Sequence, residues 1–323
     1  MVSHSTPSLM RLSMILNTFV SGPQAWFYLA EDRGYLAEEG LKLEFTPGDT
    51  AANVVPKLAL GQYDVGYGDL NALIERAARF GQQDVVAVYA TFTASPYTLA
   101  VPSDSAISGP LDLTGNSVAS HPNDAAMLMW PELAASTGLP VDAIRVELCT
   151  DSHHKMVTDL VRERRWAGMF GFVNTLRAAA IEAGLDPARS LRFIEFRHIV
   201  PDLYGASLMV RRTLAEQHPD AIRGLVRAVN RAVADTLADP ELALVAVLRR
   251  DPNLDRAANL LRLTGTIELD MAGANPCIGW VDAERLTRSA SLIARVKDLP
   301  RVPQAQELFD PSFLPPFQEW ICT

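Results

Sequence analysis

Glycines and small polar residues follow each of the apolar segments that we expect to form the first strands of a sheet. These segments lie at residues 11–17, 41–46, 63–68 and 85–92. The residues at or just after their ends are Asn17 and Thr18, Gly48 and Asp49, Gly68 and Asp69, and Thr91, Phe92 and Ser95. Ligands of α/β proteins bind at the carboxyl ends of parallel strands. We therefore expect these residues to line a binding site for a small molecule.

A second group of candidate ligand-binding residues lies in the middle of the chain. It consists of Ser120, His121 and Asn123, before a predicted helix, and of Phe170, Phe172 and Asn174, at the end of a further predicted strand. Backbone N–H groups and hydroxyls at a helix start hold an anion well. Trp26 and Tyr204 are added as rings that could stack on a flat ligand, although aromatic residues at helical spacing more often belong to the core.

Asp69 is the candidate whose charge would say most about the ligand. A carboxylate in the cleft favours a ligand with an amine or amidine, whereas an alkyl sulfonate prefers hydroxyl and N–H groups. An aspartate in front of the helix predicted at 71–80 also serves well as its N-cap. The two roles are compatible, and the residues alone leave both open.

The histidines and cysteines lack the spacing of a metal site or a catalytic centre. Adjacent helical residues such as His153 and His154 point about 100° apart, unlike an i, i+4 pair that chelates a metal. Cys149 has His153 close behind it, but a buried thiol is more commonly a small hydrophobe than a nucleophile. The sequence also contains no Walker loop and no HExxH motif. We predict no metal, no cofactor and no catalytic residue.

The bulk composition excludes several classes of protein. A length of 323 residues is enough for two domains, and a formal net charge of −9 argues against a nucleic-acid binder. The three cysteines, Cys149, Cys277 and Cys322, lie far apart, so we expect free thiols or at most one pair. No apolar run reaches the roughly 18 residues of a membrane span. The N-terminal segment lacks the basic start and long apolar centre of a signal peptide.

The order of the predicted elements is that of two α/β units. Strands alternate with helices over residues 11–92 and again over residues 97–196, a pattern that predicts parallel sheets. A last strand, predicted at 206–210, is followed by an almost wholly helical part. If the chain crosses twice between the units, residues 9–94 and 207–323 form a discontinuous first lobe. Residues 95–206 then form an inserted second lobe.

One short stretch carries most of the resemblance to a known family. In "AEDRGYLAEEGLKLEF", Gly34 and Gly40 interrupt a charged helical segment, which turns at once into an apolar-alternating strand. Together with "KLALGQYDVGYGD" and "DLTGNSVASH", it resembles the NMT1/THI5-like and SsuA-like solute-binding proteins over about residues 12–237. The resemblance implies an α/β fold of the type II periplasmic-binding-protein class. Such a fold has two lobes, each a mixed, mainly parallel sheet flanked by helices, a hinge of two crossovers and a helical C-terminal part.

The resemblance also implies a function. Members of this family capture a small organic ligand between the lobes and deliver it to the membrane permease of an ABC importer. The expected ligand is aromatic or heterocyclic, such as a pyrimidine precursor, or an organic anion, such as a sulfonate or carboxylate. The protein is expected to be a monomer that is periplasmic or exported, with the cytoplasm as the alternative.

The chain departs from the family pattern at three positions. Pyrimidine-binding members carry a tryptophan after the first strand and a histidine before the first helix, where this chain has Thr18 and Gln24. Both residues stay among the candidates for ligand binding. Ala167 stands where the family has an aspartate.

Two other functions are alternatives to transport. The first alternative is an enzyme, since some enzymes resemble the same family. Among these, the pyrimidine synthases need a cysteine-rich iron motif. A desulfinase of the same fold needs a cysteine after the first strand. Residues 17–24 of this chain contain no cysteine. A cytoplasmic ligand-sensing module is the second alternative.

Overall fold

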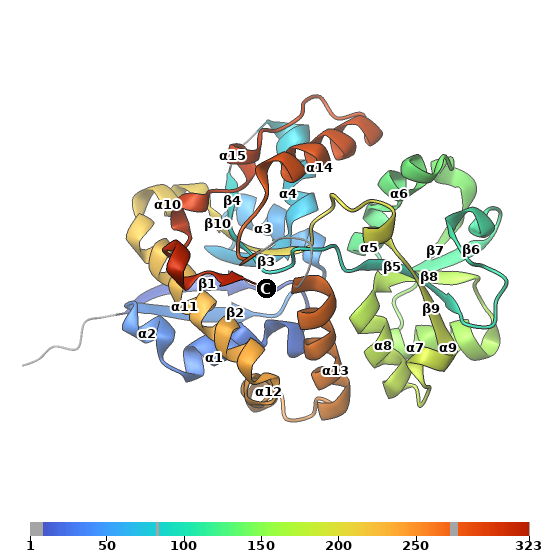
Figure 1. Ribbon diagram of the computed structural model, residues 1–323, viewed down its shortest axis with the longest axis horizontal. Coiled ribbons are helices and arrows are strands. Elements are labelled where there is room, and N and C mark those ends of the chain that lie inside the picture. Colours follow the sequence, from blue (N-terminus) through green and yellow to red (C-terminus); the bar gives the residue numbers. More distant parts are fainter. Residues whose placement is uncertain (1–8, 82–83, 272–276, 323) are drawn as a thin grey trace, which may run out of the picture.

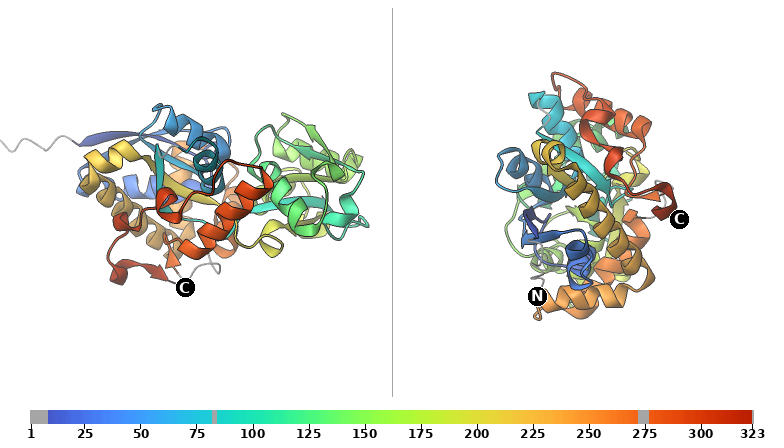
Figure 2. Two further views of the ribbon diagram at one scale, coloured as in Figure 1. Left: turned by 90° about the horizontal axis from the view of Figure 1, so that it is seen from above. Right: turned by 90° about the vertical axis from the view of Figure 1, so that its left-hand side faces the viewer.

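Two bodies, each built around a five-stranded sheet, make up the protein (Figure 1). The computed structural model describes residues 9–81, 84–271 and 277–322. The first and last parts of the chain form one body and the middle part forms the other, as Figure 1 and Figure 2 both show. The two-lobed α/β architecture is confirmed.

The first sheet has the strand order β2-β1-β3-β10-β4. Its strands are β1 (Met10–Ile15), β2 (Leu41–Thr46), β3 (Val65–Asp69), β4 (Val85–Ala90) and β10 (Ala206–Arg211). β1 pairs in parallel with β2 and β3, whereas β10 runs antiparallel between β3 and β4. The sheet is therefore mixed and mainly parallel, as the resemblance implies. The wholly parallel sheet that the alternation alone predicts is wrong, because β10 returns from the second body and separates β3 from β4.

The second sheet has the strand order β7-β6-β8-β5-β9. Its strands are β5 (Tyr97–Pro102), β6 (Ser117–Ser120), β7 (Arg145–Leu148), β8 (Gly168–Phe172) and β9 (Leu191–Glu195). β6 pairs in parallel with β7 and β8, whereas β5 runs antiparallel to both β8 and β9. The carboxyl ends of β6, β7 and β8 consequently lie at one edge of the sheet.

Two segments connect the sheets. Residues 91–96 lead from β4 to β5, and residues 196–205 lead from β9 to β10. Asn71 ties the second connection to the start of β5, since its side-chain amide donates to the Tyr97 hydroxyl at 2.7 Å and to the Tyr204 carbonyl at 2.6 Å. The lobe boundaries themselves, 9–94 with 207–323 and 95–206, stay a prediction.

Helices flank both sheets and form most of the C-terminal part. Those within the first 80 residues are α1 (Ala25–Asp32), α2 (Tyr35–Glu38), α3 (Val54–Ala59) and α4 (Leu70–Phe80). The second body has α5 (Ala125–Leu128), α6 (Trp130–Thr137), α7 (His153–Thr158), α8 (Val173–Glu182) and α9 (Pro187–Ser190). The last six are α10 (Arg212–Gln217), α11 (Pro219–Ala238), α12 (Pro240–Arg250), α13 (Arg256–Thr266), α14 (Ala283–Val296) and α15 (Ala305–Leu308). In the described ranges, no helix is long and apolar enough to cross a membrane.

Two helices differ from their predicted extents. The helix predicted over 124–137 is broken between Leu128 and Trp130, because Pro131 lacks an N–H and clashes with the turn before it. The chain starts a new helix there, with the proline in its first turn. The helix predicted over 154–164 is the α-helix α7 followed by a π-helical turn over Asp159–Glu163.

The reversal between α1 and β2 has the structure that its glycines predict. Gly34 and Gly40 have φ angles of 76° and 72°, in the left-handed region that disfavours a Cβ atom. A single helical turn, α2, lies between them. Glu39 at its end pairs with Arg227 of α11 at 2.5 Å, which holds the reversal against the helix that covers the sheet.

The last residues of the described chain are tied back by a disulfide bond. The short strands β11 (Cys277–Ile278) and β12 (Ile321–Cys322) pair antiparallel and place Cys277 opposite Cys322. These two cysteines form the disulfide, and Cys149 is a free thiol. The sequence left open whether the cysteines are all free or include one pair, and the structure has one pair.

Helix α13 lies between the two bodies (Figure 1). It packs against α12 on one side and against α8 of the second body on the other. Gly265 permits the second contact, because a Cβ atom at this position would lie 2.3 Å from Oδ1 of Asn174. A short π-helical turn, Ile267–Met271, continues α13. A helix from the C-terminal part thus reaches the junction of the two sheets.

Candidate ligand-binding cleft

A cavity of about 390 Å³ opens between the strand ends of the two sheets. The loops after β1 and β2 contribute Thr18, Phe19 and Asp49 to its wall. The loop after β6 contributes His121, the last residue of β8 is Phe172, and the loop after β7 contributes residues 150–152. Parallel strands bring these loops together because their carboxyl ends share one edge of each sheet. We call this cavity the outer chamber.

A second, smaller cavity of about 30 Å³ lies beside the outer chamber. Thr18, Phe172, Thr175 and Arg262 line both cavities, so the two lie side by side. Most of the other residues that line the smaller cavity are polar, among them Asn17, Ser21, Gln24, Asn174 and Asp270. A volume of this size holds roughly two water molecules or the head group of a small ligand. We call it the inner chamber.

Eight of the predicted site residues line these chambers. Thr18, Asp49, His121 and Phe172 line the outer one, and Asn17, Thr18, Gln24, Phe92, Phe172 and Asn174 line the inner one. They come from both sheets and are brought together as their positions at strand ends predict. That they bind a ligand stays a prediction.

Gln24 organises the loop after β1. Its side-chain oxygen accepts hydrogen bonds from the Ser21 N–H at 2.8 Å and from the Ser21 hydroxyl at 2.7 Å. Its amide nitrogen donates to Asn17 Oδ1 at 2.6 Å and to Thr18 Oγ1 at 3.1 Å. Because Gln24 is fully buried, these bonds hold Asn17 and Thr18 in place at the wall of the cleft.

Trp26 and Tyr204 lie in the protein interior instead of the cleft. Both are fully buried. The Trp26 ring makes edge contacts with Phe27 and Tyr67 at centroid distances of 6.0 Å, and the Tyr204 ring lies 4.0 Å from the Arg285 guanidinium. Neither ring lines a chamber, so stacking on a ligand is not available to them in this conformation.

Two glycines among the predicted site residues lie where neighbouring segments of the protein pack closely together. A Cβ atom at Gly48 would lie 1.9 Å from the carbonyl oxygen of Leu16, and one at Gly68 would lie 2.7 Å from the Val54 Cβ. The lack of a side chain at Gly48 lets the loops after β1 and β2 meet, and the Gly48 N–H donates to the Thr18 carbonyl at 3.0 Å.

The remaining candidates, apart from Asp69, also lie outside both chambers. Thr91, Ser95, Ser120 and Phe170 are buried in the interior, and Asn123 lines a separate surface cavity with Arg79 and Phe80. Thr91, for example, donates its hydroxyl to the Ala206 carbonyl at 2.9 Å. A strand end predicts where a loop lies, but the direction of each side chain decides whether it faces the cleft.

Asp69 is buried behind the cleft, where it caps α4. Its Oδ1 accepts from the Asn71 N–H at 2.8 Å, and its Oδ2 accepts from the Tyr97 hydroxyl at 2.6 Å. The N-cap role is therefore confirmed. The carboxylate does not line either chamber and gives no reason to expect an amine on the ligand.

The buried carboxyl of Asp69 predicts a pH dependence of stability. Burial raises its pKa from 3.8 to about 6, although hydrogen bonds from Tyr97 and Asn71 oppose the shift. The folded protein binds this proton more tightly than the unfolded chain. The contribution to stability is thus complete below about pH 4 and is lost as the pH rises through about 6. We expect Asp69→Asn, which cannot ionise, to flatten the dependence of the free energy of unfolding on pH between about 4 and 6.

Urea unfolding in half-unit pH steps measures this effect. Asp49→Asn is the matched control, since hydrogen bonds from Lys57, Asn53 and Thr50 outweigh burial and lower the pKa of Asp49 to about 2. That carboxylate is already ionised across the range, so its variant should keep the wild-type slope. Equal slopes for wild type and Asp69→Asn would contradict the assignment.

The histidines of the cleft are paired with each other. The rings of His121 and His153 lie 4.4 Å apart, and His121 Nε2 lies 2.7 Å from the Asp151 carbonyl oxygen. Burial, with smaller contributions from His121 and Arg262, lowers the pKa of His153 to about 3, so this ring is neutral. Cys149 donates its thiol to Asp151 Oδ2 at 3.4 Å, so its hydrogen-bond partner is this carboxylate and not His153.

Among the lining residues that the sequence did not predict are Phe19, Thr175, Arg262 and Asp270. Arg262 and Asp270 belong to α13 and the turn after it, more than 240 positions along the chain from the loop after β1. The one indication in the sequence is the i, i+4 spacing of Ala258, Arg262 and Thr266, which puts an arginine on the buried face of its helix. Only the packing of α13 shows that this face meets the cleft.

Comparison with known proteins identifies the fold and the family. No curated protein sequence matches the chain significantly. The structure is similar to the periplasmic aliphatic sulphonate binding protein SsuA from Escherichia coli, at 15% identity and a TM-score of 0.70, covering 94% of this chain and 92% of that one. It is also similar to the alkanesulfonate-binding protein SsuA from Xanthomonas axonopodis pv. citri bound to MOPS, at 16% identity and a TM-score of 0.68, with coverages of 94% and 99%. A third similar structure is the zinc-bound ligand binding component of an ABC-type import system from Staphylococcus aureus, at 12% identity and a TM-score of 0.68, with coverages of 94% and 97%.

These three structures are all described as binding proteins or binding components, and at such identities they show that the fold is shared. The family follows from the sequence model of the NMT1/THI5-like proteins, which matches residues 23–243. Since this match covers more than half of the chain, the protein belongs to the NMT1/THI5-like family.

Proposed function

We propose that this protein is the solute-binding component of an ABC importer and captures a small organic molecule between its two sheets. The observation that carries the proposal is the outer chamber, whose wall is built from strand-end loops of both sheets. Its volume of about 390 Å³ lies within the range of pockets that enclose small molecules. Membership of the NMT1/THI5-like family and the fold shared with SsuA proteins support the same function.

Capture would work by a change in the angle between the two bodies. A ligand that contacts Thr18 and Asp49 on one side and His121 and Phe172 on the other has more contacts when the cleft is closed. Its differential affinity for the closed form shifts the equilibrium towards that form. The two connections, residues 91–96 and 196–205, would absorb the motion. The permease would then receive the ligand from the closed form, and no covalent step is needed.

The ligand would be an aromatic or heterocyclic compound, such as a pyrimidine precursor, or an organic anion, such as a sulfonate or carboxylate. Phe19 and Phe172 give the outer chamber apolar surface, and Phe19 is 46% exposed at the cleft. The relative from Xanthomonas axonopodis was solved with the sulfonate buffer MOPS bound, which supports the anion class.

An exported location would suit the disulfide between Cys277 and Cys322. Disulfides persist in oxidising compartments such as the periplasm and are rare in the cytosol. The three similar structures include two that are described as sulfonate-binding proteins, one of them periplasmic. We propose that the protein works as an exported monomer.

A ligand panel tests the proposal by thermal shift and small-angle X-ray scattering. The panel would contain pyrimidines, sulfonates and aromatic carboxylates. A true ligand at 100 times its dissociation constant should add about 2.7 kcal/mol to the free energy of unfolding. The same ligand should reduce the radius of gyration as the cleft closes. Stabilisation without compaction would contradict the closure mechanism, and no stabilisation by any compound would count against solute binding.

Phe172→Ala should weaken the binding of any such ligand by about tenfold or more, because Phe172 lines both chambers. Phe193→Ala is the matched control. Phe193 is also partly exposed, but it lies in β9 and contacts Arg177 instead of the cleft. Isothermal titration should give the control variant the wild-type affinity. Equal losses in both variants would mean that the outer chamber is not the binding site.

A further inference from the structure

Arg262 is a buried cation at the junction of the two chambers. The residue is 6% exposed and lines both the outer and the inner chamber. Its hydrogen bond to protein is long, 3.4 Å from Nη2 to the Thr175 hydroxyl oxygen, and Phe19 lies against its guanidinium at 5.0 Å. Among the described residues, Arg262 forms no ion pair with a carboxylate and its Nε has no hydrogen-bond partner. Glu182 acts on the guanidinium electrostatically but forms no ion pair with it, so the charge has no directly bonded counter-ion within the part of the chain that the structure describes.

Burial of a cation without a counter-charge destabilises a protein, because the charge loses its hydration and gains little in return. Burial lowers the pKa of Arg262 to about 10, with the charge of Glu182 opposing the shift only in part, and the side chain stays protonated at neutral pH. Buried charged groups whose pKa is shifted by desolvation are concentrated at functional sites. The charge of Arg262 is consequently available to a molecule in the cleft.

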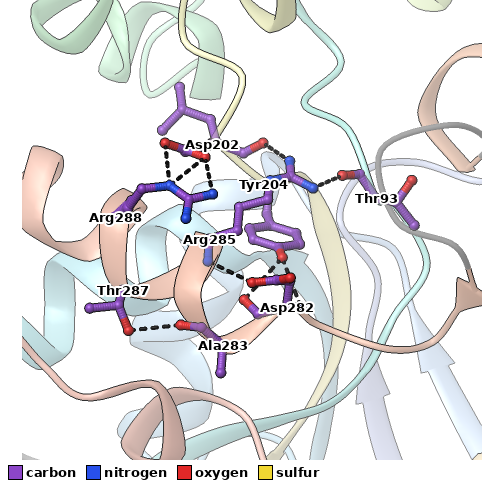
Figure 3. A network of polar contacts seen from close by, with 9 residues as sticks. Thr93, Asp202, Tyr204, Asp282, Ala283, Arg285, Thr287 and Arg288 are labelled. Atoms are coloured by element: carbon purple, nitrogen blue, oxygen red, sulfur yellow. Dashed lines mark hydrogen bonds and ion pairs between the residues drawn. The ribbon is translucent and has the colours of Figure 1, made fainter.

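Arg285 provides the contrast within the same protein. It is also 6% exposed, but it donates to the carbonyl oxygens of Thr93 and Leu203, and its guanidinium lies 4.0 Å from the Tyr204 ring. Figure 3 shows Arg285 with Thr93 and Tyr204 beside it. Arg285 is thus a structural arginine that ties the two connecting segments together, whereas Arg262 has a comparable burial without comparable bonds.

The acidic residues of the chambers are engaged with other groups. Asp49 pairs with Lys57 at 3.0 Å, and Asp270 pairs with Arg197 at 3.0 Å. Asp124 caps α5 by accepting from the Ala126 N–H at 2.8 Å. Asp151 accepts a hydrogen bond from the Cys149 thiol. Arg262 carries a positive charge in the cleft lining and forms no ion pair with another residue of the described chain, so it can attract an anionic ligand.

We infer that Arg262 binds the anionic head group of the transported solute, so that the solute is a small organic monoanion, a carboxylate or a sulfonate, with a compact apolar body. This inference rests on the proposed function, because it concerns the same cleft. The head group lies where the two chambers meet, and the body occupies the outer chamber, whose wall includes Phe19 and Phe172. A neutral pyrimidine precursor is excluded by this assignment, since it would leave the guanidinium unpaired.

Acid and amide pairs of the same shape test the charge requirement. The compounds are benzoate with benzamide, benzenesulfonate with benzenesulfonamide, and propanesulfonate with propanesulfonamide, measured by thermal shift and isothermal titration. We expect the wild type to bind acids and to ignore their neutral partners. Arg262→Met should weaken acid binding by about 10- to 100-fold, the loss typical of a hydrogen bond to a charged group. Arg262→Lys should retain part of the affinity, because it keeps the charge and loses the bidentate geometry.

The ligand-free protein gives a second readout that does not depend on the choice of compounds. Arg262→Met removes an uncompensated buried charge and keeps most of the side-chain volume, so it should raise the melting temperature of the ligand-free protein. Arg285→Met, the matched control, should lower the melting temperature because it breaks bonds to two buried carbonyls.

The outcomes separate this inference from the proposed function. A lower melting temperature for ligand-free Arg262→Met, comparable to that of Arg285→Met, would overturn the inference by giving Arg262 a structural role. If acids and their neutral partners bound equally well, and if wild type and Arg262→Met bound them alike, the role of Arg262 would be overturned. The same result would still support solute binding. A panel in which no compound binds would count against the proposed function, and a stabilised Arg262→Met would then support only the destabilising burial of the Arg262 charge.

Discussion

Replacing Trp26 with alanine should lower the free energy of unfolding by about 3–5 kcal/mol. Trp26 is fully buried in α1 and packs edge-on against Phe27 and Tyr67, so truncation leaves a large cavity between α1 and the first sheet. The surrounding aromatic side chains are themselves buried and have little freedom to fill it. Urea unfolding followed by circular dichroism measures the loss.

Two controls make the Trp26 experiment specific. Trp320→Ala should cost less, because Trp320 is partly exposed near the C-terminal end. Trp26→Phe should retain fold and ligand affinity, because the position packs against neighbours and does not line either chamber. If Trp26→Phe abolished ligand binding while the protein stayed folded, the interpretation of Trp26 as a stacking residue would be restored and the core assignment would be wrong.

Replacing both Cys277 and Cys322 with serine should lower the free energy of unfolding by about 4 kcal/mol. The disulfide closes a loop with a sequence separation of 45, and its loss returns conformational entropy to the unfolded chain. The antiparallel pair of β11 and β12 has two residues in each strand, too few to hold the chain end without the covalent bond. Urea unfolding of the oxidised protein and of the double variant compares the two states.

Reducing agent separates the disulfide from other effects of the substitutions. Dithiothreitol should shift the wild-type midpoint towards that of the double variant and leave the double variant unchanged. Cys149→Ser is the control, because Cys149 is a free thiol and should not change the response to reduction. A wild-type midpoint that ignores reduction would mean that the pair contributes nothing to stability.

Local features of the fold could be read from the residues because local physics decides them. Gly34 and Gly40 predict two left-handed positions that reverse the chain between α1 and β2, and both have positive φ. Asp69 predicts the cap of α4 through its short side chain and its place before the helix. The strand order could not be read in the same way. β10 joins the first sheet as an antiparallel strand after the chain has formed the whole second sheet.

The sequence predicts part of the candidate site, and there is a physical reason why it cannot predict the rest. Strand ends predict which segments meet, and the loops after β1, β2 and β6 do meet the end of β8 at the outer chamber. Within those loops, whether a side chain faces the cleft depends on the packing around it. Thr18 and Phe172 face the cleft, whereas Phe170, two positions earlier in β8, is buried.

The sequence by itself determined the α/β class, the family and the loops at the strand ends, since these follow from periodicity, turn residues and motifs along the chain. Only the tertiary structure decided that Trp26 belongs to the core, that Cys277 bonds to Cys322 and that Arg262 reaches the cleft. Periodicity shows that a face of a helix is buried, but not what it is buried against. For α13 that partner is the junction of the two bodies, where Arg262 lies between segments that are far apart in the chain.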